Sequence, residues 1–110
     1  MKLPLEPRMY IIVREDLAYK FIQGQHALAK FSIEHHEKFL VWNNQYLINL
    51  SVFNGLALQE LRINLLESVV EFSSFFEPDL ESPLPTALCL FDNGVNGYRE
   101  HLKHLNLASK

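Results

Sequence analysis

Two apolar runs place narrow limits on how this chain can fold. Residues 9–14 are "MYIIVR" and residues 86–91 are "TALCLF", and neither run alternates polar with apolar side chains. Consecutive apolar residues in the first run indicate a strand that is buried on both faces, as in the middle of an α/β sheet. The second run continues apolar after its threonine and has the length of a strand. We therefore predict strands over residues 9–14 and 86–91.

A helix is predicted directly after the first strand. Ile22, Ala29 and Ile33 recur at helical spacing and indicate a helix from about Phe21 to His35. Gly24 lies inside it, where glycine costs about 1 kcal/mol relative to alanine. Such a glycine is expected where another element packs very close to the helix. Residues 35–44 predict a short helix or a loop.

The remaining segments continue the alternation of strands and helices. Residues 45–55 alternate polar with apolar side chains and predict a strand, after which Asn54 can cap a helix. The strongest helical stripe predicts a helix over Leu56–Ser73, and residues 94–107 predict a C-terminal amphipathic helix. A short extended segment near residues 74–77 could add one more strand. The order favours a single α/β domain over residues 1–110, with a small parallel or mixed sheet flanked by helices.

Composition limits the class of protein further. The chain has 110 residues, a net charge of −3 and one cysteine, so it cannot form an intramolecular disulfide. Cys89 is expected to be a buried apolar side chain. No apolar run reaches the roughly 18 residues of a membrane span, so we expect no membrane partner and a cytoplasmic location. The acidic balance argues mildly against a nucleic-acid-binding surface, because phosphate neutralisation usually requires a basic one.

Candidate site residues gather at the start of the first predicted helix. Gln23 and His26 lie one helical turn apart, and His26 is either a general base or phosphate contact, or a histidine bonded to backbone at a helix–sheet junction. Lys20, beside the helix start, either meets an anion or is solvated. The histidine pairs at 35–36 and at 101 and 104 supply too few converging ligands for zinc, so we expect no metal and no cofactor.

An acidic, proline-rich loop precedes the last predicted strand. Glu77, Asp79 and Glu81 place three carboxylates within five residues, where they either interact with a ligand or face solvent in a turn. Thr86 follows Pro85 and either presents its hydroxyl to a site or only begins the strand. The sequence alone leaves these alternatives open.

Several of these residues resemble the type 2 peptidyl-tRNA hydrolase family. "YIIVREDL" followed by "QGQHALAKF" is similar to the opening strand and helix of that family, and "TALCLF" is similar to its closing strand. The resemblance covers about residues 9–91, and we expect a hydrolase-like core over residues 8–91. It implies a compact domain with a four-stranded mixed sheet, and hydrolysis of the ester between a nascent peptide and tRNA without a required metal.

The resemblance carries over residue by residue only in part. Thr86 matches the family's threonine at the start of the last strand, and Lys20 lies one residue too close to Gln23 to match the family's lysine. Ser74 and Pro78 stand where the family has an aspartate and a second threonine. The loop resembles instead a divergent branch with a Glu-Pro-Asp-Leu loop.

Two functions follow as expectations. As a peptidyl-tRNA hydrolase-like enzyme, the chain would use Lys20, His26, Asp79 and Thr86 as catalytic residues, and Arg14, Gln23, Lys30 and Glu77 would bind the substrate. As a catalytically inactive module of the same fold, it would bind a nucleotide, RNA or protein partner in the same groove. A homodimer is compatible with both functions.

Overall fold

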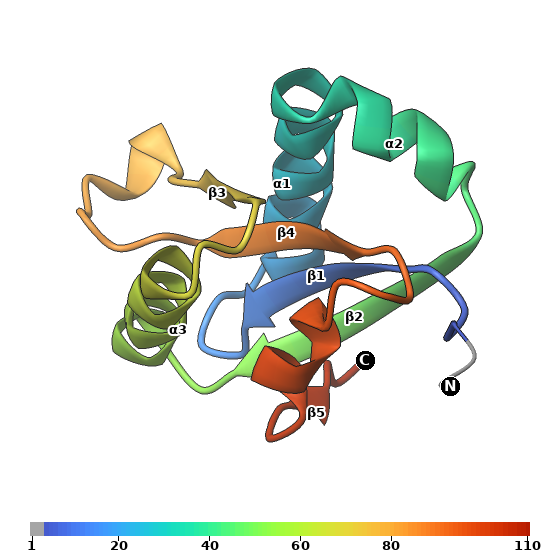
Figure 1. Cartoon of the computed structure of the whole chain (residues 1–110). Helices are drawn as coiled ribbons and strands as arrows, with labels where there is room; N and C mark the ends of the chain where they lie inside the picture. Colours follow the sequence, from blue (N-terminus) through green and yellow to red (C-terminus); the bar gives the residue numbers. More distant parts are fainter. Residues whose placement is uncertain (1–3) are drawn as a thin grey trace.

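The two apolar runs form the two central strands of one sheet (Figure 1). The structure is a computed structural model, and it describes residues 4–110. The first run is β1 (Arg8–Arg14) and the second is β4 (Ala87–Asp92), and they pair antiparallel, with Ile11 opposite Cys89. β4 is buried along its whole length, so the sequence prediction for both strands is confirmed.

Within residues 4–110, the sheet has five strands in the order β3-β4-β1-β2-β5. The other strands are β2 (Tyr46–Val52), β3 (Phe72–Phe75) and β5 (Asn106–Leu107). Only β1 and β2 run parallel, and the remaining pairs are antiparallel. The sheet is therefore mixed, as expected, but it has one strand more than the four that the resemblance implied.

Helices cover both faces of the sheet (Figure 1). They are α1 (Lys20–Glu34), α2 (His36–Trp42) and α3 (Gly55–Glu67), with two short 3-10 turns, η1 (Pro78–Leu80) and η2 (Tyr98–Leu102). One core lies beneath α1 and α2 and includes Phe31 and Trp42. A second core lies beneath α3 and η2 and includes Leu58 and Leu102. The central strands contribute side chains to both cores, which explains why they lack polar alternation.

α1 packs tightly against the sheet at Gly24. A Cβ atom at this position would lie 2.8 Å from Cγ2 of Ile11 and 3.1 Å from Cγ1 of Val13. The close neighbour expected from the sequence is therefore β1. This approach fixes the first turns of α1, and with them the candidate residues, against the sheet.

The predicted end of the second long helix, Ser73, is wrong. α3 ends at Glu67, where Val69 adopts a left-handed conformation with φ of 57°. The N–H of Val70 bonds the carbonyl of Leu65 at 3.0 Å, and the N–H of Val69 bonds that of Leu66 at 3.1 Å. These two bonds form a Schellman motif, in which glycine is the usual residue at the position of Val69. The residues after this stop form β3.

The predicted C-terminal helix over residues 94–107 is also wrong. Only Tyr98–Leu102 are helical, as a 3-10 turn that buries Leu102 against the core. The chain then pairs Leu107 with Leu50 and Asn106 with Ser51 along β2. A single short helix is marginal on its own, whereas the open edge of β2 offers backbone hydrogen bonds to this segment.

Candidate functional site

A chain of side-chain hydrogen bonds links the start of β4 to the acidic loop through α1. The hydroxyl of Thr86 lies 2.8 Å from Oε1 of Gln23, and Nε2 of Gln23 donates to Oε2 of Glu77 at 3.2 Å. Thr86 is 1% exposed and Gln23 is 8% exposed. The carbonyl of Phe75 accepts from the Thr86 N–H at 2.8 Å and lies 3.1 Å from its hydroxyl. Three sequence-predicted site residues are thus in direct contact.

Glu77 also begins the turn that carries Asp79. Its Oε1 accepts from the backbone N–H of Asp79 at 3.4 Å, as the N-cap of η1, and Pro78 occupies the first turn. Proline fits there because the first helical N–H groups have no partner within the helix. Asp79 itself is exposed, and the turn that Glu77 caps sets its position.

A cavity of about 490 Å³ lies between the start of α1 and η1. Its apolar lining includes exposed side chains, since Tyr19 is 71%, Ile22 48% and Leu80 45% exposed. Glu77 and Asp79 supply its carboxylates, and Gln23 supplies an amide. The lining residues are Leu17, Ala18, Tyr19, Ile22, Gln23, Glu77, Asp79 and Leu80. No lysine or arginine belongs to this set.

Lys20 is engaged away from this cavity. Its ammonium forms an ion pair with Glu15 and donates to Oγ of Ser109 at 2.7 Å. The backbone N–H of Ser109 also donates to Oε2 of Glu15 at 2.8 Å. The hydrogen bond from Lys20, followed by those from Ser109, lowers the pKa of Glu15 to about 2. Lys20 thus fastens the C-terminal segment to the loop between β1 and α1.

Arg14 has a structural position at the end of β1. Its guanidinium donates to both carboxylate oxygens of Asp16, at 3.0 and 2.8 Å, and to the carbonyl of Pro85 at 3.3 Å. The hydrogen bond from Arg14 is the largest cause that lowers the pKa of Asp16. Gly55 packs against this guanidinium, since a Cβ there would lie 2.8 Å from Cζ of Arg14. Arg14 therefore fixes the residue before Thr86.

Lys30 and His26 lie farther along α1, against β3. The Lys30 ammonium donates to the carbonyl of Ser74 at 2.7 Å, and His35 Nε2 lies 3.2 Å from the carbonyl of Phe72. His26 is exposed and stacks on Phe75, with ring centroids 4.6 Å apart. Arg14, Lys20 and Lys30 are therefore each bonded to a different partner, and none of the three lines the cavity.

The structure brings some predicted residues together and separates others. Gln23, Glu77 and Asp79 line the cavity. Thr86 is not part of the lining, but its hydroxyl is hydrogen-bonded to Gln23. Lys20, Lys30 and His26 do not line it. Sequence reasoning missed Ile22 and Leu80, whose exposure beside a cavity has no sequence signal. Among residues 4–110, no three His, Cys, Asp or Glu side chains gather closely enough to hold a metal ion.

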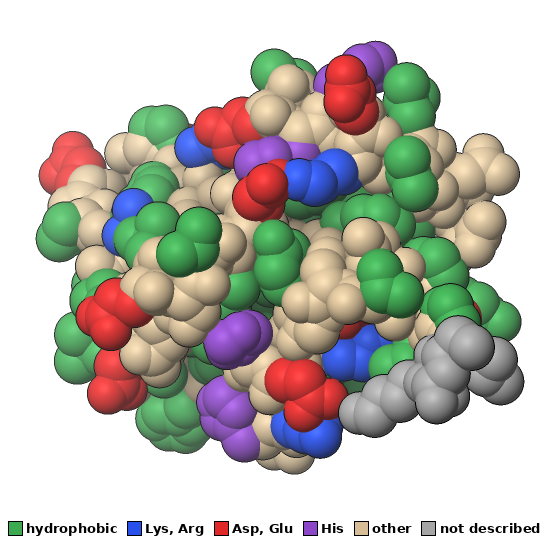
Figure 2. Space-filling view, viewed as in Figure 1, with side chains coloured by type: hydrophobic (Ala, Val, Ile, Leu, Met, Phe, Trp, Pro, Cys, Tyr) green, Lys and Arg blue, Asp and Glu red, His purple; other side chains and the backbone are tan. Residues whose placement is uncertain are grey.

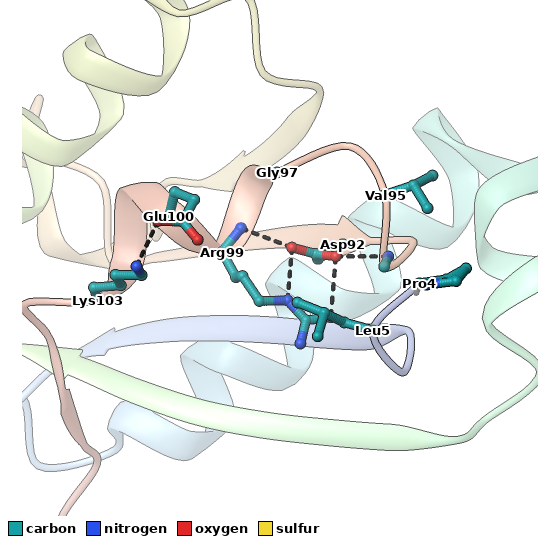
Figure 3. Close-up of a pocket in the computed structure, with 9 residues that line it drawn as sticks. Pro4, Leu5, Asp92, Val95, Gly97, Arg99, Glu100 and Lys103 are labelled. Atoms are coloured by element: carbon teal, nitrogen blue, oxygen red, sulfur yellow. Dashed lines mark hydrogen bonds and ion pairs between the residues drawn. The ribbon is translucent and has the colours of Figure 1, made fainter. Parts of the chain in front are cut away.

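A second hollow lies at the other end of β4 (Figure 3). It has a volume of about 760 Å³ and surrounds the buried pair of Asp92 and Arg99. Burial would raise the pKa of Asp92, but the bonds from Arg99 and from the N–H groups of Gly94 and Arg99 outweigh it, so the pKa lies below its usual value. Because Asp92 and Arg99 satisfy one another, this hollow contains a structural ion pair.

Comparison with known proteins defines the fold class and no more. No protein-family model matches the chain, and no curated protein matches it. A solved structure of a protein of unknown function from Agrobacterium tumefaciens strain C58 is similar, with a TM-score of 0.61 and 12% identity. The match covers 96% of this chain and 99% of that one. The α/β fold is therefore shared over nearly the whole length of both chains.

Proposed function

We propose that this protein is a binding module that holds a segment of a protein partner in the cavity between α1 and η1. The observation that carries the proposal is the lining, which combines exposed apolar side chains with two carboxylates and no basic residue. An apolar cavity with a few convergent polar groups is a common form of binding site. A ligand that fits this lining has an apolar side chain beside a cation.

The same lining disfavours a nucleic acid as the partner. Phosphate groups would meet Glu77 and Asp79 without a compensating lysine or arginine in the cavity. On the face of the molecule drawn in Figure 2, the Lys and Arg side chains lie singly among acidic and apolar ones. The chain as a whole carries a net charge of −3. A protein segment is thus the partner that the charge distribution supports best.

The positions of the expected catalytic groups also support binding over ester hydrolysis. Thr86 is 1% exposed and bonded to Gln23, so its hydroxyl does not face the cavity as an oxyanion donor would. Lys20 is paired with Glu15, outside the cavity lining. Asp79 would then face its ligand without a partner for proton transfer.

None of the residues 4–110 belongs to a helix with the length and apolarity to cross a membrane.

Peptide titration followed by NMR tests the proposal. The probe is acetyl-Phe-Leu-Lys-amide, and we expect amide shift changes at Ala18, Ile22 and Leu80 that saturate with peptide concentration. Leu80→Asn should weaken them, because it replaces an apolar side chain of the lining by a polar one and adds no charge that would attract the lysine of the peptide. Leu66→Asn is the matched control, since Leu66 is 52% exposed on α3, away from the cavity. Shift changes that are absent, or that are scattered over the surface, would refute the proposal.

A turnover assay tests the competing hydrolase function on the same protein. An N-acetylated aminoacyl-tRNA is incubated with the wild type and with Lys20→Ala and Asp79→Ala. We expect release of the amino acid at the rate of the uncatalysed reaction in all three samples. Release that is faster in the wild type and lost in both variants would establish catalysis and overturn the binding-module proposal.

A further inference from the structure

We infer that Gln23 is the specificity-determining residue of the cavity, because it holds the Glu77 carboxylate at the rim in position to accept a cation. This inference rests on the proposed function and names the residue that sets its ligand preference. Gln23 lies in the first turns of α1, is 8% exposed, and contacts both Thr86 and Glu77. It acts through Glu77 and is therefore a positioning residue.

The hydrogen-bond chain has only one consistent direction. A carboxylate accepts hydrogen bonds but cannot donate them, so Glu77 must face the NH₂ group of the Gln23 amide. The carbonyl oxygen of that amide then faces Thr86, 2.8 Å away, and the Thr86 hydroxyl must donate to it. The carbonyl of Phe75 lies 3.1 Å from the same hydroxyl, but it already accepts the backbone N–H of Thr86 at 2.8 Å, so it keeps a partner when the hydroxyl donates to Gln23. The amide of Gln23 is thus fixed at both ends.

This fixed amide leaves Glu77 with capacity for a ligand. A carboxylate offers about four lone-pair sites. Gln23 uses one oxygen of Glu77, and the N–H of Asp79 approaches the other at 3.4 Å. Both donors are uncharged, so neither of them offsets a negative charge on Glu77. Asp79 follows on the same turn, and the two carboxylates border an otherwise apolar lining. An ammonium or guanidinium group next to an apolar side chain complements this arrangement.

The test compares three peptides of the form acetyl-Phe-Leu-X-amide, where X is lysine, norleucine or glutamate. For the wild type, we expect the lysine peptide to bind about threefold to fivefold more tightly than the norleucine peptide, as for a partly solvent-screened ion pair. The glutamate peptide should bind more weakly than both. Norleucine keeps the apolar stem of lysine but lacks its charge. The dissociation constant of the norleucine peptide divided by that of the lysine peptide therefore reports the charge preference alone.

Gln23→Met should lower the ratio of the two dissociation constants toward one, because methionine fills the same space but cannot hold Glu77, while Asp79 stays in the lining. The norleucine peptide should still bind, which separates lost positioning from lost folding. Gln25→Met is the matched control, since Gln25 is an exposed glutamine on the same helix, and it should keep the wild-type ratio.

Thr86→Val and Thr86→Ser form a second, independent pair. Valine removes the donor to the Gln23 amide and should lower the ratio, whereas serine keeps the hydroxyl and should restore it. If the wild type binds all three peptides equally, or Gln23→Met keeps the wild-type ratio, the inference about Gln23 is overturned while the binding function stands. If no peptide binds the wild type, the binding function fails and the inference fails with it.

Discussion

Replacing Asp92 by asparagine is expected to destabilise the protein strongly, without creating a cavity. The Asp92 side chain is 1% exposed and accepts four hydrogen bonds, from Nε and Nη2 of Arg99 at 2.9 and 3.1 Å and from the N–H groups of Arg99 and Gly94, both at 2.7 Å (Figure 3). Asparagine has nearly the same volume but presents one NH₂ group to these donors. It also leaves the Arg99 guanidinium, whose side chain is 11% exposed, without its counter-charge.

The size of the effect follows from this burial. Removing one partner of a buried ion pair costs about 3–5 kcal/mol, mainly because the remaining charge is buried without compensation. A domain of this size has a total stability of about 5–15 kcal/mol, so the variant loses a large share of it. Near the melting temperature, 1 kcal/mol corresponds to about 4 °C for a chain of this length. We therefore expect the melting temperature to fall by about 12–20 °C.

Urea unfolding at pH 7, followed by circular dichroism, measures this loss directly. Glu100→Gln is the matched control, because Glu100 forms a pair with Lys103 at 2.6 Å beside the same hollow, with side chains 59% and 70% exposed. Such an exposed pair contributes only about 0.5 kcal/mol or less. If Asp92→Asn loses less than about 1 kcal/mol, or no more than Glu100→Gln, the reasoning from burial is refuted.

The acid limb of the same experiment gives a second check on Asp92. Its pKa is lower in the folded protein than in the unfolded chain, so the pair contributes stability that is fully present above the unfolded value of about 4. This contribution is lost as the pH falls through the folded pKa. The stability difference between the wild type and Asp92→Asn should therefore shrink below pH 4, and a constant difference would contradict the assigned charge state.

Three further predictions follow from other parts of the fold. Glu15→Gln should cost about 1 kcal/mol above pH 5, and the cost should vanish as the pH falls toward 2, since the Lys20 pair depresses the pKa of Glu15 to about 2 and is partly solvent-screened; pH-dependent urea unfolding measures it. Val69→Gly should stabilise the protein by about 1 kcal/mol in the same assay, because Val69 is 83% exposed and a β-branched residue is strained at φ of 57°; a loss of stability would contradict this. Combined Lys30→Ala and His35→Ala should increase self-association measured by light scattering, since these side chains cover the outer carbonyls of the edge strand β3; an unchanged mass would refute this account of the edge.

Local sequence patterns predicted the elements that are determined by their own residue types. The apolar runs of β1 and β4 are central strands because they supply both cores. The Asn54 cap predicted from the sequence is confirmed, since its Oδ1 accepts from the N–H of Ala57 at 2.9 Å. Gly24 is explained by contact with β1. In each case one residue type and its neighbours were sufficient.

The failures have a different physical origin. The end of α3 depends on a left-handed backbone conformation at Val69, where glycine is the usual residue. Because valine stands there, the sequence contains no signal for the end of the helix. The C-terminal strand forms because the edge of β2 is open, which is a property of the assembled sheet. Lys20 likewise finds Ser109, 89 residues away. Partners this distant in sequence leave no local pattern, and they took the expected basic residues out of the candidate site.

Two acceptors would compete for the hydroxyl hydrogen of Thr86. One is the Gln23 amide, and the other is the oxyanion of the ester hydrolysis that the family resemblance implies. In a hydrolase, the Thr86 hydroxyl would donate to the developing oxyanion. A threonine has a single hydroxyl hydrogen, and the chain from Thr86 through Gln23 to Glu77 requires that hydrogen for the amide. Leaving the buried oxygen of Gln23 without a donor would cost about 1–3 kcal/mol. The contact that positions Glu77 therefore opposes use of the same hydroxyl in ester hydrolysis, and this opposition is a physical reason for proposing binding in place of hydrolysis.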